Sequence, residues 1–284
     1  MSLELGGVEI RAERRGVDGN TKAFHRLMKE LEGTVDVLAV GGTEIAFHVD
    51  GEMLPFRSSK KLIAGVEATP VVDGSGLKLT LERRVFELAA KVDRTLSAVP
   101  RFEQAFLNVA LDRWGMALAV DEVAERSIYG DLMFSFGIPL PIRSLAGVKR
   151  VAKTLVPVAG LLPLKWLYPS GDSQTVRQPK FPELFASSDL ICGDFLYIAK
   201  HAPDDLGGKT VLTNTTTEAN VEWLAGTGVD LLITTTPRFD GRSFGTNLTE
   251  AIITAAVESD RPLTVDEMNA TIDELGILPD VTRF

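Results

Sequence analysis

Four short segments of this sequence combine the residue types that hold small polar ligands. They are Gly41-Gly42-Thr43, the stretch 73–78, the stretch 214–217 and Thr235-Thr236-Pro237. Each follows an apolar run that predicts a buried strand. Glycines let a ligand approach the backbone, and hydroxyl and amide groups supply neutral hydrogen bonds. Such loops also favour Gly, Ser, Thr and Asn simply as turn and cap residues, so each segment alone has a structural explanation.

Together, the segments favour a binding site for a small polar molecule. The candidate substrate-binding positions in the first two are Gly41, Gly42, Thr43, Ser75 and Lys78. A further stretch, 240–247, is a turn that leads into a predicted helix and adds Arg242, Ser243 and Asn247. Free amides at a helix start, beside a guanidinium, form a good carboxylate or phosphate pocket. A capped surface turn with a solvated arginine explains this stretch equally well.

A pair of lysines, Lys60 and Lys61, follows a predicted helix start and could supply an acid or base. Burial lowers the pKa of a lysine and makes it useful for proton transfer. Adjacent lysines on a helix more often face solvent, which is the simpler interpretation.

Several other kinds of site are not expected. His25, His48 and His201 have no metal-ligand spacing to one another or to Cys192, so we expect no metal site. The sequence contains no G-x-S-x-G elbow, no P-loop and no complete G-x-G-x-x-G fingerprint.

The elements that would position these residues alternate between strands and helices. Apolar runs predict strands at 8–14, 35–40, 44–49, 69–72, 189–192, 209–213 and 230–234. Helical spacing predicts helices at 21–32, 58–66, 79–98, 101–113, 117–126, 217–226 and 247–259. A last helix opens at Thr264 with a capping box and stops at Gly276.

This alternation predicts an α/β fold with two Rossmann-like layers of parallel strands and flanking helices. We expect an N-terminal α/β domain over 1–130, on the substrate side. A helical, proline-rich crossover over 131–185 would lead to a C-terminal Rossmann-like domain over 186–284. Ligands of open parallel sheets bind outside the carboxyl ends of the strands, where the polar segments lie.

Composition narrows the class of protein. The 284 residues are 45% hydrophobic and 24% charged, as in a globular protein. The net charge of −9 argues against a nucleic-acid partner, because no basic surplus is available for phosphates. The single cysteine, Cys192, fits a reducing compartment, so we expect a cytoplasmic protein. The most apolar region, 132–168, is interrupted by charges and prolines, so we expect no membrane partner. A homodimer is compatible with the sequence.

Three stretches resemble the shikimate and quinate dehydrogenases. They are Gly207-Gly208-Lys209-Thr210-Val211-Leu212-Thr213-Asn214-Thr215-Thr216, Trp223-Leu224-Ala225 and Asp230-Leu231-Leu232-Ile233-Thr234-Thr235-Thr236-Pro237. A wider likeness to bacterial proteins labelled quinate 5-dehydrogenase includes 69–77 and 142–145. The resemblance implies an NAD or NADP cofactor. The cofactor-binding residues it implies are Asn214, Thr215, Thr216, Thr235, Thr236 and Pro237.

The resemblance also implies a catalytic lysine and aspartate, which map onto Lys60 or Lys61 and Asp73. The lysine would stabilise a developing alkoxide while the carboxylate moves the hydroxyl proton. Gly193-Asp194-Phe195 stands where the family has a glycine-rich loop, and Thr215 stands at an arginine position.

The sequence therefore favours an NAD(P)-linked oxidoreductase acting on a small polyhydroxy carboxylic acid similar to quinate or shikimate. The alternative is a non-catalytic binding protein for a phosphorylated or carboxylated metabolite. The absent glycine-rich loop favours this alternative, and the family likeness favours the enzyme.

Overall fold

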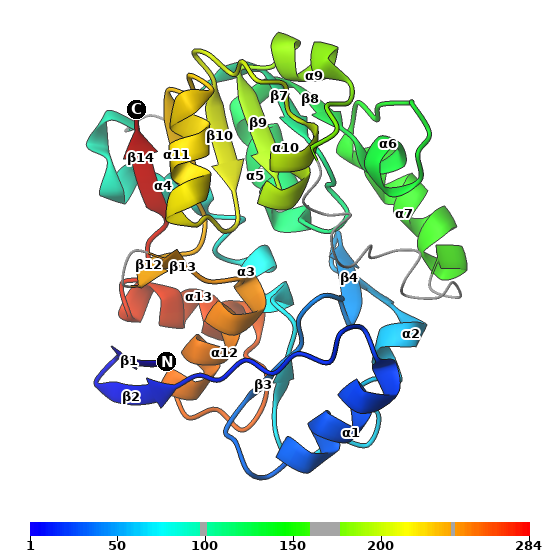
Figure 1. Ribbon diagram of the computed structural model, residues 1–284, viewed down its shortest axis with the longest axis vertical. Helices are drawn as coiled ribbons and strands as arrows, with labels where there is room; N and C mark the ends of the chain where they lie inside the picture. Colours follow the sequence, from blue (N-terminus) through cyan, green and yellow to red (C-terminus); the bar gives the residue numbers. More distant parts are fainter. Residues whose placement is uncertain (97–100, 160–176, 240–241) are drawn as a thin grey trace.

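The computed structural model describes residues 1–96, 101–159, 177–239 and 242–284, and shows a mixed α/β protein (Figure 1). Among these residues the largest element is a six-stranded sheet, here called the main sheet. Its strands, in spatial order, are β14 (Asp280–Arg283), β11 (Leu231–Thr234), β10 (Thr210–Thr213), β9 (Leu190–Gly193), β7 (Phe102–Leu107) and β8 (Ala124–Tyr129). All of its neighbouring strands run parallel except β14, which is antiparallel to β11.

The chain order of the parallel strands gives the main sheet a topological switch point. Counted from β7, the spatial order is 2-1-3-4-5, one of the two common orders of doubly wound sheets. The chain passes from β7 to β8 on one side and returns to β9 on the other. The carboxyl ends of β7 and β9 therefore border the position where such sheets bind ligands.

Helices cover both faces of the main sheet because its strands are apolar on both sides. Leu107, Cys192 and Leu212 face one hydrophobic cluster, whereas Phe106 and Ile191 face the other. The first cluster includes residues of α4 (Val85–Val92), α5 (Trp114–Val123) and α7 (Leu145–Ala159). The second includes residues of α9 (Pro182–Ser187), α10 (Phe195–His201) and α11 (Glu218–Gly226).

A second part of the molecule lies against the carboxyl edge of the main sheet, below it in Figure 1. Its strands pair as β1 (Ser2–Leu5) with β2 (Val8–Arg11), β3 (Leu38–Ala39) with β6 (Val71–Val72), and β4 (Ala46–Val49) with β5 (Glu52–Pro55). Its helices are α1 (Thr21–Leu31), α2 (Arg57–Lys60), α3 (Ser75–Leu79), α12 (Thr246–Ala256) and α13 (Val265–Glu274). Only β3 and β6 pair in parallel here, through two residues each.

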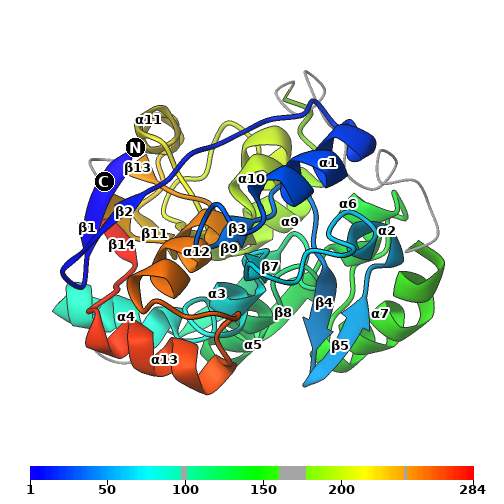
Figure 2. The same cartoon turned by 90° about the horizontal axis from the view of Figure 1, so that it is seen from below.

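The remaining elements are short. They are the 3₁₀ helix η1 (Arg94–Leu96), α6 (Asp131–Ser135) and the two-residue strands β12 (Arg238–Phe239) and β13 (Arg242–Ser243). The β4–β5 hairpin lies beside α7, where Lys153 pairs with Glu52 at 2.7 Å (Figure 2). The helical stretch after 131 thus packs on the main sheet and on the hairpin.

Most of the predicted elements are present, and their end signals work as expected. The Thr264 side chain accepts from the Glu267 amide, and the Glu267 carboxylate accepts from the Thr264 amide. This confirms the capping box. The predicted helix over 79–98 is shorter, because the chain turns at 80–84 before α4 begins; within α4, Val92 is 44% exposed and not buried.

The helix predicted over 101–113 was wrong. Residues 102–107 form β7, an inner strand paired with both β8 and β9. Only Ala105-Phe106-Leu107 of β7 is buried, and periodicity cannot distinguish so short an apolar run from part of a buried helix. The predicted helix over 117–126 likewise ends in strand β8, which begins at Ala124.

Because residues 102–107 form a strand, the division of the chain into parts differs from the predicted domains. β7 and β8 lie within the predicted segment 1–130, yet they join the same sheet as the strands after 186. In the other direction, α12 packs on α3 and on β3. The main sheet and the second part therefore each draw on both predicted domains.

Candidate functional site

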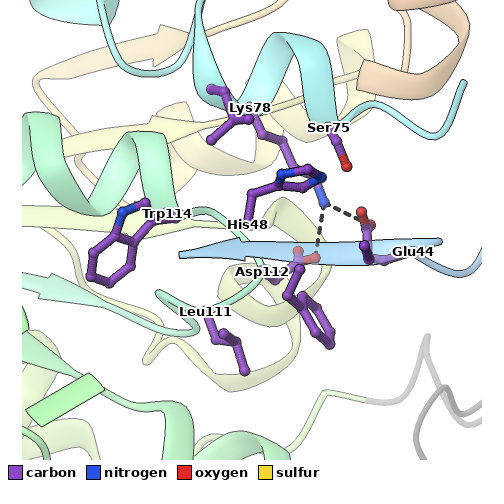
Figure 3. Close-up of a pocket in the computed structure, with 10 residues that line it drawn as sticks. Glu44, His48, Ser75, Lys78, Leu111, Asp112 and Trp114 are labelled. Carbon is purple, nitrogen blue, oxygen red and sulfur yellow. Dashed lines mark hydrogen bonds and ion pairs between the residues drawn. The ribbon is translucent and has the colours of Figure 1, made fainter. Parts of the chain in front are cut away.

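A buried lysine forms the centre of the candidate site. Lys78 lies on α3, and its Nζ donates to Glu44 Oε1 at 2.6 Å and to Asp112 Oδ1 at 2.9 Å (Figure 3). The side chains of Lys78, Glu44 and Asp112 are 7%, 14% and 28% exposed. We call these three residues the lysine cluster. Burial of this kind requires each charge to have a partner, and here each has one.

A small pocket opens beside the lysine cluster, with a cavity volume of about 10 Å³, roughly the space of one water molecule in this conformation. One set of lining residues is polar and the other is aromatic or aliphatic (Figure 3). The polar residues are Glu44, His48, Ser75, Lys78 and Asp112. The apolar residues are Ala46, Phe47, Leu79, Leu111 and Trp114.

Three separate parts of the chain supply these residues. The β4 hairpin and the turn before it bring Glu44 and His48, and the loop after β7 brings Asp112. Gly115, on α5, allows α3 to approach closely, because an added Cβ would lie far inside contact with the carbonyl oxygen of Lys78. The lysine cluster thus depends on direct backbone contact between α3 and α5.

The environment drives the two carboxyl groups of the lysine cluster apart in pKa. Burial raises the pKa of Glu44 to about 8, although the Lys78 ammonium opposes this. Burial also acts to raise the pKa of Asp112, but Lys78 and Arg113 outweigh it and leave the value below the usual one. Burial lowers the pKa of Lys78, yet Asp112 and Glu44 outweigh it and the net shift is upward. Near neutral pH, Glu44 then carries a proton while Asp112 is ionised and Lys78 is charged.

A chain of charges links the lysine cluster to the switch point. Arg113, next to Asp112, is 4% exposed and forms ion pairs with the buried Glu82 and, at 3.0 Å, with Asp194. Asp194 Oδ2 also accepts from Asn214 Nδ2 at 3.0 Å. The Asp194 carboxylate is therefore neutralised within the protein.

The predicted ligand-binding loops do come together. An added Cβ on Gly41 would lie 3.1 Å from Asn247 Nδ2, and one on Gly74 would lie 2.9 Å from the Asn247 amide. On the other side, Ser243 Oγ donates to Thr216 O at 2.9 Å. The segment 243–247 thus joins the loops of the second part to those of the main sheet.

The residues predicted to bind substrate differ in whether they line the pocket. Ser75 and Lys78 line the pocket, whereas Gly41, Gly42 and Thr43 do not. Thr43 is buried, and its Oγ1 is 2.7 Å from Ser59 Oγ. The Arg242 side chain falls outside what the structure describes.

The residues predicted to be catalytic are either bonded to the backbone or exposed to solvent. Both carboxylate oxygens of Asp73 accept backbone amides, from Ile45 at 2.7 Å and from Ser75 at 3.0 Å. This arrangement anchors the loop that starts α3. Lys60 and Lys61 are exposed. Among the residues that the structure describes, the buried lysine is Lys78.

The predicted cofactor-binding residues are mostly enclosed. Thr216, Thr235 and Thr236 are fully buried, and Asn214 is 8% exposed. Thr215 and Pro237 are half-buried. The hydroxyl of Thr236 donates to the carbonyl of Asn214 at 2.7 Å. In this conformation these side chains hold the strand ends together.

The switch-point loops do not fit the pyrophosphate of a nicotinamide dinucleotide. A pyrophosphate needs free amides at the first turn after the strand. Here the amides of Ala110 and Leu111 donate to Asp131, and the Leu196 amide donates to Asp194. The Phe195 amide donates to Asn214 Oδ1. Whether NAD or NADP binds elsewhere stays a prediction.

Two features of the described residues concern metals and membranes. No group of three or more His, Cys, Asp and Glu side chains there is arranged to hold a metal ion. None of the helices in those ranges is long and apolar enough to cross a bilayer.

Sequence reasoning missed Asp112, Arg113 and Asn108 because it placed them at the end of a helix. Glu44 was missed because it lay beyond the Gly-Gly-Thr motif, inside a predicted strand. Its signal would have been a charged residue within an apolar run, which calls for a partner when buried.

Comparisons with known proteins identify families without an assigned function. No curated protein matches the chain. A crystal structure from Mycobacterium smegmatis is similar over 89% of this chain and 81% of that chain, at 14% identity and a TM-score of 0.28. Residues 1–73 match a domain of unknown function, DUF8753. A second domain of unknown function, DUF8754, matches residues 76–284. The pocket takes Glu44 and His48 from the first range and Lys78 and Asp112 from the second. Because the DUF8754 match covers most of this chain, the chain belongs to the DUF8754 family.

Proposed function

We propose that this protein is an enzyme that binds a small polyhydroxylated molecule beside Lys78 and moves the proton of one of its hydroxyl groups. The observation that carries the proposal is the lysine cluster itself. One ammonium lies within 2.9 Å of two carboxyl oxygens, and all three residues line a pocket. Buried groups with opposite pKa shifts beside a cavity are typical of acid–base sites.

The walls of the pocket favour a hydroxylated ligand. Carboxyl groups, His48 and Ser75 offer hydrogen bonds, and Trp114, Phe47 and other apolar side chains supply apolar surface. A polyhydroxylated ring has polar edges and apolar faces, which matches this division. A carboxyl group on the ligand follows from the resemblance to quinate and shikimate dehydrogenases alone.

The lysine cluster holds the groups for this proton transfer, and the pocket must widen to admit the ligand. An ammonium has three N–H donors, and among the described residues Lys78 uses two of them, on Glu44 and Asp112. The third is available to a ligand hydroxyl oxygen. Asp112, ionised near neutral pH, accepts the hydroxyl proton, and the ammonium stabilises the alkoxide that develops. Glu44, still protonated, keeps the site close to neutral overall.

The experiment is a calorimetric titration with quinate, shikimate and a neutral cyclic polyol. Asp112→Asn keeps the shape of the side chain but removes the base and one charge-assisted bond. We expect affinity to fall about tenfold or more, since such a bond contributes about 1.5–3 kcal/mol. Lys22→Gln, a change at an exposed lysine of α1, is the control and should stay within about twofold.

The outcomes separate the competing functions. Equal affinity in Asp112→Asn and wild type, or no binding of any tested ligand, contradicts the proposal. Binding without any chemical change in the ligand favours the non-catalytic binding protein. When NAD⁺ or NADP⁺ is added, its reduction by hydride from a quinate or shikimate hydroxyl carbon supports the dehydrogenase predicted from the resemblance.

A further inference from the structure

Asp131 makes an unusual pair of contacts at the switch point of the main sheet. It follows β8, and its two carboxylate oxygens accept from the amides of Leu111 at 2.8 Å and Ala110 at 3.2 Å. These amides belong to the turn between β7 and α5. The side chain of Asp131 is almost fully enclosed, with the residue only 2% exposed.

The turn has the form of an anion site. It is the first strand-to-helix turn of a doubly wound sheet, at the N-terminus of the ten-residue helix α5. Backbone amides and the helix dipole both favour a negative charge at this point. The turn presents the Ala110 and Leu111 amides to a negative charge, and a carboxylate of the protein takes both of them.

We propose that Asp131 is a built-in ligand, which holds the β7–α5 turn with a protein carboxylate where other doubly wound sheets bind a phosphate. An acidic residue at the end of the second strand usually accepts the ribose hydroxyls of a dinucleotide. In this protein both oxygens of that residue are turned onto the backbone. The switch point is therefore occupied from within, and the protein takes no dinucleotide there. This inference does not depend on the proposed function.

Burial makes the negative charge of Asp131 unfavourable unless the backbone amides stabilise it. Burial raises its pKa to about 6, although the Leu111 and Ala110 amides oppose the shift. The two amides are what keep a buried carboxylate in place without a cationic partner at hydrogen-bond distance. Removing the carboxylate leaves both amides unpaired and ready for another anion.

Chemical rescue tests the proposal. Asp131→Ala should lower the midpoint of thermal unfolding, and inorganic phosphate should raise it again by about 2–4 °C more than in wild type. Sodium chloride at equal ionic strength corrects for general salt effects. The matched control is Asp189→Ala. Asp189 also accepts two backbone amides, from Glu103 at 2.9 Å and Gln104 at 2.8 Å, but at the amino end of β7. Phosphate should give this variant no specific rescue.

A second measurement covers the case in which Asp131→Ala does not fold. Wild type is titrated with NADH and NADPH at up to about millimolar concentration and followed by nicotinamide fluorescence, next to the near-isosteric Asp131→Asn. We expect no binding at the switch point, so any nicotinamide signal of wild type should be unchanged in Asp131→Asn. Binding that is weakened in Asp131→Asn would show that Asp131 is a ribose ligand and would overturn the proposal. Phosphate that stabilises folded Asp131→Ala no more than chloride does would overturn it as well.

Discussion

At the scale of single residues, contacts between distant parts of the chain decide which charged side chains are buried and paired. The local sequence around each residue does not decide this. Lys61 and Lys78 are both lysines at or near short helices, but one is exposed and the other pairs with Glu44 and Asp112. The sequence marked Ser75 and Lys78 as candidates through the loop after the strand, and both line the pocket. It could not assign Lys78 a partner, because Asp112 is brought to it by the packing of α5 on α3.

The raised pKa of Glu44 predicts a pH dependence of stability. The pKa is about 8 in the folded protein, against 4.5 in an unfolded chain. Between these values the unfolded chain has released the proton and the folded protein still holds it. The free energy of unfolding contributed by Glu44 is therefore fully present below about pH 4.5 and lost as pH rises toward 8.

Glu44→Gln removes this titration. We expect its free energy of unfolding to decline less than that of wild type between about pH 5 and 8, by on the order of 1–3 kcal/mol. Urea denaturation at several pH values measures the difference. Glu30→Gln, at an exposed glutamate, serves as the control and should follow wild type. Parallel curves for wild type and Glu44→Gln would show that Glu44 is ionised when buried.

At the scale of elements, the error over 101–113 explains most of what sequence reasoning missed. Once Phe102–Leu107 is a strand, its end becomes the switch point, and Asn108, Asp112 and Arg113 become loop residues at a ligand-binding edge. The later strands were predicted closely because glycines and polar turns mark both of their ends. β7 is followed by Asn108-Val109-Ala110-Leu111, which carries no such mark.

The close contact between α3 and α5 predicts that a methyl group added at Gly115 destabilises the protein. A Cβ on Gly115 would overlap the carbonyl oxygen of Lys78, so Gly115→Ala must push the two helices apart. We expect a loss of about 1–3 kcal/mol in the free energy of unfolding, the usual cost of overpacking, together with weaker ligand binding. Gly226→Ala is the matched control, because Gly226 also lies in a helix but has nothing within 4 Å of an added Cβ. It should change stability by less than about 1 kcal/mol. Equal stability in the two variants would mean that α3 and α5 move freely.

At the scale of the whole molecule, the predicted α/β class holds, with one mostly parallel main sheet and a second part made of short strands and helices. Single-chain patterns show which segments are strands, but not which strands are neighbours. For that reason the predicted domains followed the order of the chain, whereas the main sheet combines strands from both sides of residue 130. The candidate site lies where the two parts meet, between the β4 hairpin, α3 and the loop after β7.

The most direct test of the account is whether a hydroxylated ligand binds beside Trp114. This residue lines the pocket, whereas Trp223 belongs to the hydrophobic cluster that includes α10 and α11. The measurement is tryptophan fluorescence during titration with the tightest ligand of the quinate, shikimate and polyol panel. We predict a saturable change in wild type and in Trp223→Phe, and no change in Trp114→Phe. A change that persists in Trp114→Phe and disappears in Trp223→Phe would place the ligand away from Lys78 and contradict the account.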